Sequence, residues 1–193
     1  MNRGEDREQV SMPTTSTTTA LRSRLDAVAR WDAAVLTALA RIERRGLDSA
    51  MKALTRAGDT PGWVVHGLVL FATRSIDVHG LAVMGSAAAM ATGASQLAKR
   101  AFRRRRPTAS IPGFVARTAD PDPFSFPSGH STVAFAIATA AMATSPVLGA
   151  VELILAASIA SSRLYLGAHY PVDVLGGMAL GLACGLAAFG LAG

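Results

Sequence analysis

Three short polar segments contain the residue types that phosphate chemistry requires. They are residues 99–107 (KRAFRRRRP), 127–131 (PSGHS) and 162–173 (SRLYLGAHYPVD). Lys99, Arg106 and Arg163 supply fixed positive charge, and a planar guanidinium group can bind two phosphate oxygens at once. We therefore expect these three side chains to bind a phosphate group.

The second and third segments add groups that cap a helix and move protons. Ser128 followed by Gly129 is typical of a helix N-cap, where free N–H groups face an anion and glycine permits close approach. His130 and His169 can exchange protons near neutral pH. Asp173, four residues after His169, can accept a hydrogen bond from one imidazole nitrogen and fix the tautomer, which leaves the other nitrogen as a nucleophile.

Each feature also has a purely structural interpretation. Arginines such as 100 and 103–105 are more often lipid anchors or topology signals than ligands of a substrate, and we assign them that role. A PSG turn commonly precedes a helix, and a single histidine near a helix end is more often structural. His66 and His79 keep that interpretation, because neither has a catalytic type of residue beside it. The ordered combination of the three segments is far more specific than any one of them.

The polar segments lie at the ends of apolar runs, some of which are long enough to span a membrane. Of the 193 residues, 50% are apolar and 17% charged, and the mean hydropathy of +0.33 argues against disorder and against an ordinary soluble domain. The apolar runs cover residues 63–73, 80–98, 131–144, 147–160 and 174–193. A spanning helix needs about 20 predominantly apolar residues, so the second and last runs qualify outright.

From these runs we expect an all-α integral membrane bundle of about five spanning helices over residues 60–193. If the spans are antiparallel, all three polar segments lie on one side of the membrane. Gly177, Gly181 and Gly185 recur every four residues, which lets helices approach closely in lipid, and we expect this contact to be internal. A soluble, alanine-rich bundle is the alternative, and the lack of charge after Val174 argues against it.

The first 59 residues have a different character. Residues 1–20 are charged and then rich in serine and threonine, which predicts a disordered tail. Residues 21–59 have a helical apolar pattern interrupted by charges at 41–45, which favours amphipathic helices in the membrane interface over a span. The alternative is a pair of ordinary helices on a soluble domain. We expect residues 21–193 to form a single domain.

The cysteine count and the charge distribution exclude several classes of site. Cys184 is the sole cysteine of the sequence, so neither an intrachain disulfide nor a thiolate zinc site can form. The net charge is +6, and residues 99–107 alone contribute six basic residues and no acidic one. Because no carboxylate cluster accompanies the polar segments, we expect no metal and no cofactor.

The three segments together match a known set of motifs. Residues 99–107 fit K-x6-R-P, residues 127–130 read P-S-G-H, and residues 162–173 fit S-R-x5-H-x3-D, in order and without a mismatch. In these motifs the chain resembles the type 2 phosphatidic acid phosphatase (PAP2) superfamily over about residues 50–192. The resemblance implies a membrane enzyme that removes phosphate from lipid phosphates or from polyprenyl phosphates and diphosphates.

The resemblance also implies a role for each matched residue. His169 would attack phosphorus and form a phosphohistidine, with Asp173 orienting and activating it. His130 would protonate the leaving alkoxide and later deprotonate the hydrolytic water. The nonbridging oxygens would be held by Lys99, Arg106, Ser128, Gly129 and Arg163.

Topology and substrate are expected from charge and family. Five spans would place 18 of the 19 basic residues on the side of the motifs and only Arg74 on the other, which predicts a site that faces the cytoplasm. The composition, rich in alanine and arginine, is typical of a bacterium with high genomic GC content, so we expect a bacterial inner membrane protein. The expected substrate is a polyprenyl-linked phosphosugar, namely decaprenylphosphoryl-5-phosphoribose. Phosphatidylglycerophosphate, phosphatidic acid and undecaprenyl diphosphate are the alternatives.

Two other classes of protein share part of this pattern. Vanadium haloperoxidases have the same motifs but are soluble, which the five apolar runs oppose. A nonenzymatic basic membrane protein that binds anionic lipid would explain the arginine run but neither histidine. We expect the lipid bilayer and a membrane lipid phosphate as partners, and no nucleic acid. The sequence does not indicate an oligomeric state.

Overall fold

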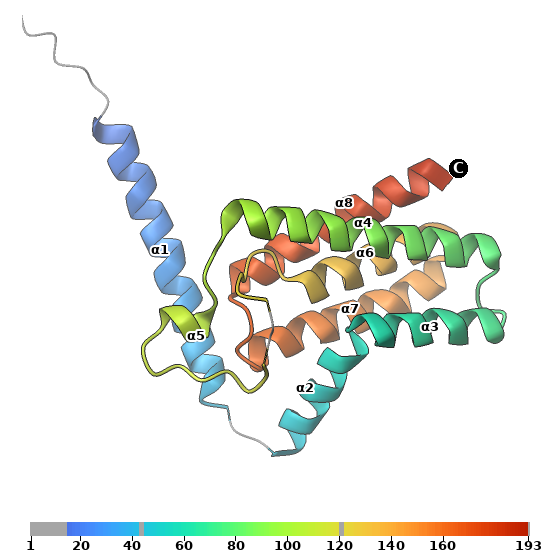
Figure 1. Ribbon diagram of the computed structural model, residues 1–193, viewed down its shortest axis with the longest axis horizontal. Coiled ribbons are helices and arrows are strands. Elements are labelled where there is room, and N and C mark those ends of the chain that lie inside the picture. The colour runs from blue at the N-terminus through green and yellow to red at the C-terminus, as the bar shows by residue number, and fades with distance from the viewer. Residues whose placement is uncertain (1–14, 43–44, 120–121, 193) are drawn as a thin grey trace, which may run out of the picture. The chain divides into compact units, whose positions relative to one another are not determined.

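The computed structural model describes residues 15–42, 45–119 and 122–192, which form helices joined by loops (Figure 1). The helices are α1 (Thr15–Ala40), α2 (Arg45–Ala57), α3 (Thr60–Ala72), α4 (Val78–Phe102), α5 (Pro107–Ser110), α6 (Gly129–Thr144), α7 (Pro146–Tyr165) and α8 (Pro171–Ala192). These ranges contain no strand, and an isolated bridge joins Arg105 to Phe124. The predicted all-α fold class is confirmed.

Helix α1 begins inside the segment that the sequence predicted to be disordered. Residues 1–14 of that segment lie outside the described residues, whereas residues 15–20 form the first turns of α1. A helix extends at little cost once nucleated, so the pattern that starts at Leu21 can draw the preceding threonines into it. The chain up to Trp31 forms one unit and the chain from Asp32 another. In the first unit, residues 18–31 of α1 are exposed.

Three of the described helices are long and apolar enough to cross a membrane, namely α4, α7 and α8. Helix α3 is shorter, since 13 residues at 1.5 Å each rise about 20 Å, less than the roughly 30 Å hydrocarbon core. Exposed apolar side chains such as Val65, Ile154 and Leu186 suit contact with lipid. The protein is therefore an integral membrane protein, and a total of five spans remains a prediction.

Helix α6 lies at the centre of the membrane helices and packs against α4, α7 and α8 (Figure 1). Nine of its residues are buried, most of them alanine. The predicted glycine stripe of α8 faces α6. A Cβ on Gly177 or Gly185 would come within 2.6 Å of the carbonyl oxygen of Ser128 or Ala136, and one on Gly181 would meet Thr132. The stripe therefore makes an internal contact, and only glycine allows the two backbones to approach so closely.

Candidate active site

The three polar segments of the sequence meet in the structure. From the first segment, Arg106 places Nη1 3.4 Å from Nε2 of His169 in the third. From the second segment, the backbone N–H of Ser128 donates to the carbonyl oxygen of Asp173 at 2.9 Å. These contacts join residues that are 63 and 45 positions apart in the chain. The helix packing described above thus brings cations, imidazoles and a helix N-terminus to one place.

Ser128 caps α6, as its position before Gly129 predicted. Its side chain accepts a hydrogen bond from the backbone N–H of Ser131, and its own backbone is extended. The start of α6 is close to Lys99, because a Cβ added to Gly129 would lie 3.8 Å from the Lys99 ammonium nitrogen. A positive helix terminus and an ammonium group therefore lie side by side, an arrangement that favours an anion.

His169 is almost completely enclosed, with 1% of its side chain exposed. It lies in the short connection between α7 and α8. Burial, the largest cause, and the positive charges of Arg163 and Arg106 together lower the pKa of His169 to about 4 against the opposing effect of Asp173. The imidazole is therefore neutral at physiological pH, and a neutral imidazole has a lone pair available for attack on phosphorus.

Asp173 lies next to His169 but beyond hydrogen-bond distance. The closest approach, from Nδ1 of His169 to Oδ2 of Asp173, is 3.7 Å. Both carboxylate oxygens already accept hydrogen bonds, Oδ1 from Arg104 at 2.7 Å and Oδ2 from the backbone N–H of Tyr170 at 2.9 Å. The hydrogen bond expected from the sequence is therefore not formed here. Catalytic hydrogen bonds are often this long before substrate binds.

The three predicted cations are all buried and held by backbone or side-chain oxygens. Arg106 donates from Nε to the carbonyl oxygen of Asp122 at 2.5 Å and from Nη1 to that of Ala168 at 2.9 Å. Arg163 donates to the hydroxyl of Thr55 at 2.6 Å. Lys99 forms an ion pair with the carboxylate of Asp122. Fixed in this way, the cations lose little further conformational entropy when they bind an anion.

Asp122 is a carboxylate that sequence reasoning did not single out. Burial raises the pKa of Asp122, but hydrogen bonds from Lys99 and from the backbone N–H of Phe124, with the charge of Arg106, outweigh burial and leave the pKa below its usual value. The Asp122 side chain is therefore ionised and pairs with the Lys99 ammonium group. A bound phosphate would compete with Asp122 for the same ammonium group.

His130 has a carboxylate partner from a different part of the chain. Its Nε2 lies 2.8 Å from Oδ1 of Asp59, which directly precedes α3. Gly58 comes so close that a Cβ there would lie 3.1 Å from the His130 ring. His130 is 19% exposed and Asp59 49%, so the pair is in contact with solvent. The sequence did not predict this partner, although the segment Asp-Thr-Pro-Gly at residues 59–62 stood out as the break between the amphipathic and the apolar part of the chain.

Arg104 corrects the interpretation of the arginine run. The sequence assigned residues 100 and 103–105 to lipid anchoring or topology, and Arg100, Arg103 and Arg105 are indeed exposed. Arg104 instead donates to Asp173 at 2.7 Å and to Asp32 at 2.5 Å. One-dimensional spacing could not separate it from its neighbours, because all four share the same local context. What distinguishes Arg104 is its contact with two carboxylates that are 69 and 72 residues away in the chain.

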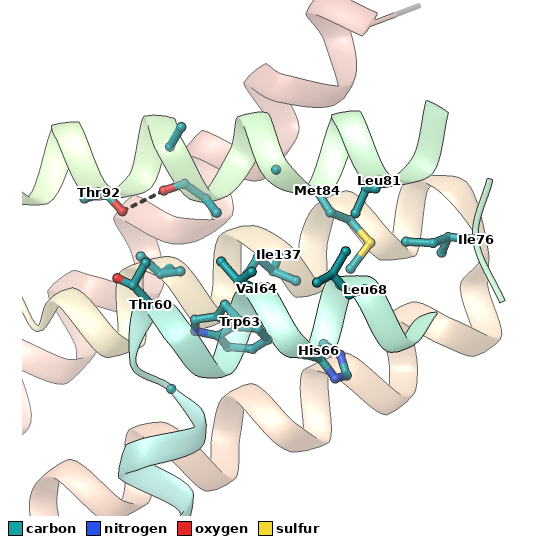
Figure 2. A pocket seen from close by; sticks show the side chains of 16 residues that line it. Thr60, Trp63, Val64, His66, Leu68, Ile76, Leu81, Met84, Thr92 and Ile137 are labelled. Carbon is teal, nitrogen blue, oxygen red and sulfur yellow. Dashed lines mark hydrogen bonds between the residues drawn. The ribbon is translucent and has the colours of Figure 1, made fainter. Parts of the chain in front are cut away.

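An apolar cavity of about 400 Å³ lies between α3, α4 and α6 (Figure 2). Gly58 and Thr60 line one end, and a Cβ added to Gly58 would lie 3.1 Å from the His130 ring, so this end of the cavity is near His130. Leu81 and Met84 line the other end, and Trp63 lies between them (Figure 2). His66 also lines the cavity, and its Nε2 is 2.6 Å from Oε1 of the buried Glu152, a partner that supports its structural interpretation.

Comparison with known proteins places the chain in a family. Residues 80–192 match the model of the PAP2 superfamily. The decaprenylphosphoryl-5-phosphoribose phosphatases of Mycolicibacterium smegmatis and Mycobacterium tuberculosis are 33% and 32% identical, over 69% and 81% of this chain and 73% and 88% of theirs. A PAP2-type phosphatidylglycerolphosphate phosphatase from Bacillus subtilis has a similar crystal structure, with a TM-score of 0.71, 25% identity and 86% of each chain covered.

The match covers more than half of the chain and includes all three polar segments. The chain therefore belongs to the PAP2 superfamily and is a lipid phosphatase of that family.

Proposed function

We propose that this enzyme hydrolyses a phosphomonoester of a membrane lipid through a phosphohistidine on His169, without a metal ion. The observation that supports this most directly is the buried, neutral imidazole of His169, whose Nε2 lies 3.4 Å from Nη1 of Arg106. A neutral nucleophile beside fixed cations is what phosphoryl transfer requires, because that reaction depends on positioning and on charge stabilisation.

The reaction proceeds in two steps. Nε2 of His169 forms a bond to phosphorus as the bond from phosphorus to the lipid oxygen breaks, and His130 donates a proton to that oxygen. His130, now neutral, then takes a proton from water, whose oxygen attacks phosphorus and breaks the bond to His169. Asp173 stabilises the positive charge that the His169 ring acquires in the intermediate.

The nonbridging oxygens are bound by the groups that surround His169. Lys99, Arg106 and Arg163 supply positive charge, and the start of α6 at Ser128 and Gly129 supplies N–H donors. These groups stabilise the charge that develops in the transition state, which is the task of a metal ion in many other phosphatases. On binding, the phosphate displaces the carboxylate of Asp122 from Lys99.

Chelation and vanadate test the metal-independent reaction. We expect EDTA to leave the rate unchanged, since side chains provide the charge. We expect vanadate to inhibit, because it adopts the five-coordinate geometry of the transition state and would accept the same donors. Activity that disappears with EDTA and returns with magnesium would contradict the proposal.

For the substrate we propose a polyprenyl-linked phosphosugar, decaprenylphosphoryl-5-phosphoribose, used in cell-wall precursor synthesis. The names of the mycobacterial relatives support this choice. The apolar cavity beside His130 supports a long hydrocarbon tail, because it runs along α3 and α4 among membrane helices. Phosphatidylglycerophosphate is the second candidate, because the similar structure from Bacillus subtilis is named a phosphatidylglycerolphosphate phosphatase.

A phosphate-release screen with purified protein distinguishes these substrates. Decaprenylphosphoryl-5-phosphoribose, phosphatidylglycerophosphate, phosphatidic acid and undecaprenyl diphosphate would be compared at equal concentration in detergent, with His169→Ala as the blank. We expect the highest kcat/KM for the phosphosugar lipid. Wild-type release no higher than that of a protein-free reaction on every lipid would favour the alternative of a nonenzymatic protein that binds anionic lipid.

We further propose that the site faces the cytoplasm from the bacterial plasma membrane, with five spans and with α1 and α2 at the interface. The exposed side chains of α1 include Leu21, Leu25 and Val28 beside Arg22 and Arg24, a pattern typical of an interfacial helix. A reporter that is active only outside the cytoplasm, fused after Gly193, would report activity if five spans are correct. Silence of that reporter, with a cytoplasmic reporter active at the same position, would contradict them.

A further inference from the structure

Arg104 joins two buried carboxylates that come from distant helices. Its Nη1 donates to Oδ1 of Asp173 at 2.7 Å, and its Nη2 donates to Oδ2 of Asp32 at 2.5 Å. The guanidinium group also lies over the ring of Tyr170, 4.2 Å from its centroid. Burial lowers the pKa of Arg104, but the two carboxylates raise it above its usual value, so the group stays charged.

Asp32 has a second contact that links it to the same helix as Asp173. Its Oδ1 accepts the backbone N–H of Val172 at 3.0 Å, in the first turn of α8. Both Asp32 and Asp173 are completely buried. Asp32 therefore fixes the start of α8 directly, and through Arg104 it also fixes the carboxylate of Asp173.

The contacts of Arg104 and Asp32 with Asp173 also affect the electrostatic field at His169. Arg106 reaches it from the connection after α4, Arg163 from α7 and Asp173 from α8, and Arg104 and Asp32 lie immediately behind Asp173. Asp173 is the negative charge among the three groups in direct electrostatic contact with the ring. Arg104 weakens the field of Asp173 at His169, and Asp32 offsets Arg104.

We propose that Arg104 and Asp32 are positioning residues that orient the Asp173 carboxylate and set the negative charge it presents to His169. This inference rests on the proposed function, in which His169 becomes positively charged as it bonds to phosphorus. In the proposed mechanism neither residue binds the phosphate. They act on the reaction through Asp173, and they belong to no residue role that the three motifs assign.

The test compares single and double charge-neutralising variants by the pH dependence of kcat/KM. In Asp32→Asn, Arg104 is no longer balanced, so we expect the midpoint of the acid limb to move to lower pH by about half a unit or more. In Arg104→Gln, Asp173 acts unopposed, so the midpoint moves to higher pH by a similar amount. In the double variant the two shifts cancel, and the midpoint returns to about that of the wild type.

The rate constants give a second readout. We expect Arg104→Gln to lower kcat about tenfold or more with KM within about twofold, since the substrate contacts remain. Arg104→Lys keeps the charge and should recover part of that loss while leaving the acid limb unshifted. Arg105→Gln is the matched control, because Arg105 is an exposed neighbour in the same run, and it should behave as wild type.

The outcomes separate this inference from the proposed function. If His169→Ala is inactive while Arg104→Gln and Asp32→Asn match Arg105→Gln in kcat and pH profile, the positioning role is wrong and the nucleophile stands. Shifts of both single variants in the same direction would indicate general loosening of the site and would also overturn the inference. If His169→Ala is as active as wild type, the proposed function itself fails.

Discussion

The two histidines of the site have contrasting surroundings. His169 is 1% exposed, lies 3.7 Å from a completely buried carboxylate and is surrounded by arginines. His130 is 19% exposed, lies 2.8 Å from the half-exposed carboxylate of Asp59 and borders an apolar cavity through Gly58. Each imidazole thus has one carboxylate partner, but the first pair is enclosed and the second is in contact with water.

This difference matches the different tasks proposed for them. A nucleophile benefits from a dry, fixed environment, because it must stay neutral and aligned with phosphorus. A group that gives a proton to the lipid oxygen and later takes one from water needs access to both. Burial therefore separates the two roles, although the residue type is the same. The predictions below test this separation, from the largest expected effect to the smallest.

Replacing His169 with alanine should reduce phosphate release to background, because alanine has no nitrogen that could form the proposed bond to phosphorus. The variant should remain folded and membrane-bound, since the methyl group leaves the ion pair of Asp173 with Arg104 intact. The measurement is inorganic phosphate released from a lipid phosphate, with elution volume in detergent as the control for folding. Substantial turnover by this variant would show that the nucleophile is wrongly assigned.

Replacing His130 with glutamine should lower kcat by about 10² to 10³, the range expected for loss of a general acid. The loss should be smaller for a lipid-linked aryl phosphate, whose leaving group departs without a proton. Comparison of the two substrates measures proton donation separately from folding or binding. An equal loss on both substrates would count against His130 as the general acid.

The burial of His169 should also make the protein less stable in acid. The pKa of His169 is lowered from 6.5 to about 4, so between these pH values the unfolded chain binds a proton that the folded chain does not. Stability therefore falls as the pH falls through this window, by up to about 3 kcal/mol for this one group.

Thermal unfolding in detergent at pH 7 and pH 5 measures this effect. We expect a smaller acid-induced fall of the midpoint in His169→Gln than in wild type. His130→Gln is the matched control, because His130 is in contact with solvent, and it should keep the wild-type fall. If all three proteins lose the same amount, the buried imidazole is not the source of the acid sensitivity.

Replacing Asp59 with asparagine should lower kcat only about two- to fivefold. The pair with His130 is partly exposed, and such ion pairs contribute little in water. The amide keeps one oxygen that can accept from the ring. Steady-state kinetics beside those of Asp173→Asn would sharpen the comparison, since the buried carboxylate should matter at least tenfold more. A larger loss in Asp59→Asn than in Asp173→Asn would reverse our view of which pair the reaction depends on.

Periodicity and motif spacing predicted much of this molecule. The apolar runs became α3, α4, α6, α7 and α8, because continuous hydrophobic segments of that length form helices in lipid. The N-cap at Ser128 and the internal glycine stripe followed from local rules that need no knowledge of the tertiary fold. The short helix α5 and the start of α1 were not predicted, since both consist of polar or mixed residues without a clear pattern.

The partners of the predicted site residues could not be found in the same way. Asp32, Asp59 and Asp122 each reach the site from a separate segment, and nothing in their local sequence distinguishes them from the carboxylates that lie elsewhere in the chain. Arg104 is one of four consecutive arginines, and only the fold decides which of them faces Asp173. Motifs identify groups that act on a substrate, whereas the charges that balance those groups depend on tertiary contacts.

The glycine stripe of α8 has a consequence for the whole site. Ser128 caps α6, and Asp173 lies in the first turn of α8. The distance between these two helices is set by the three glycines of the stripe, which have no side chain. A methyl group introduced at Gly185, far from any reacting atom, would act as a wedge. Because both helices are stiff, separating them at that end would tilt Ser128 at the start of α6 away from Asp173 at the start of α8. The alignment of the active site therefore depends in part on the absence of side chains at these three glycines.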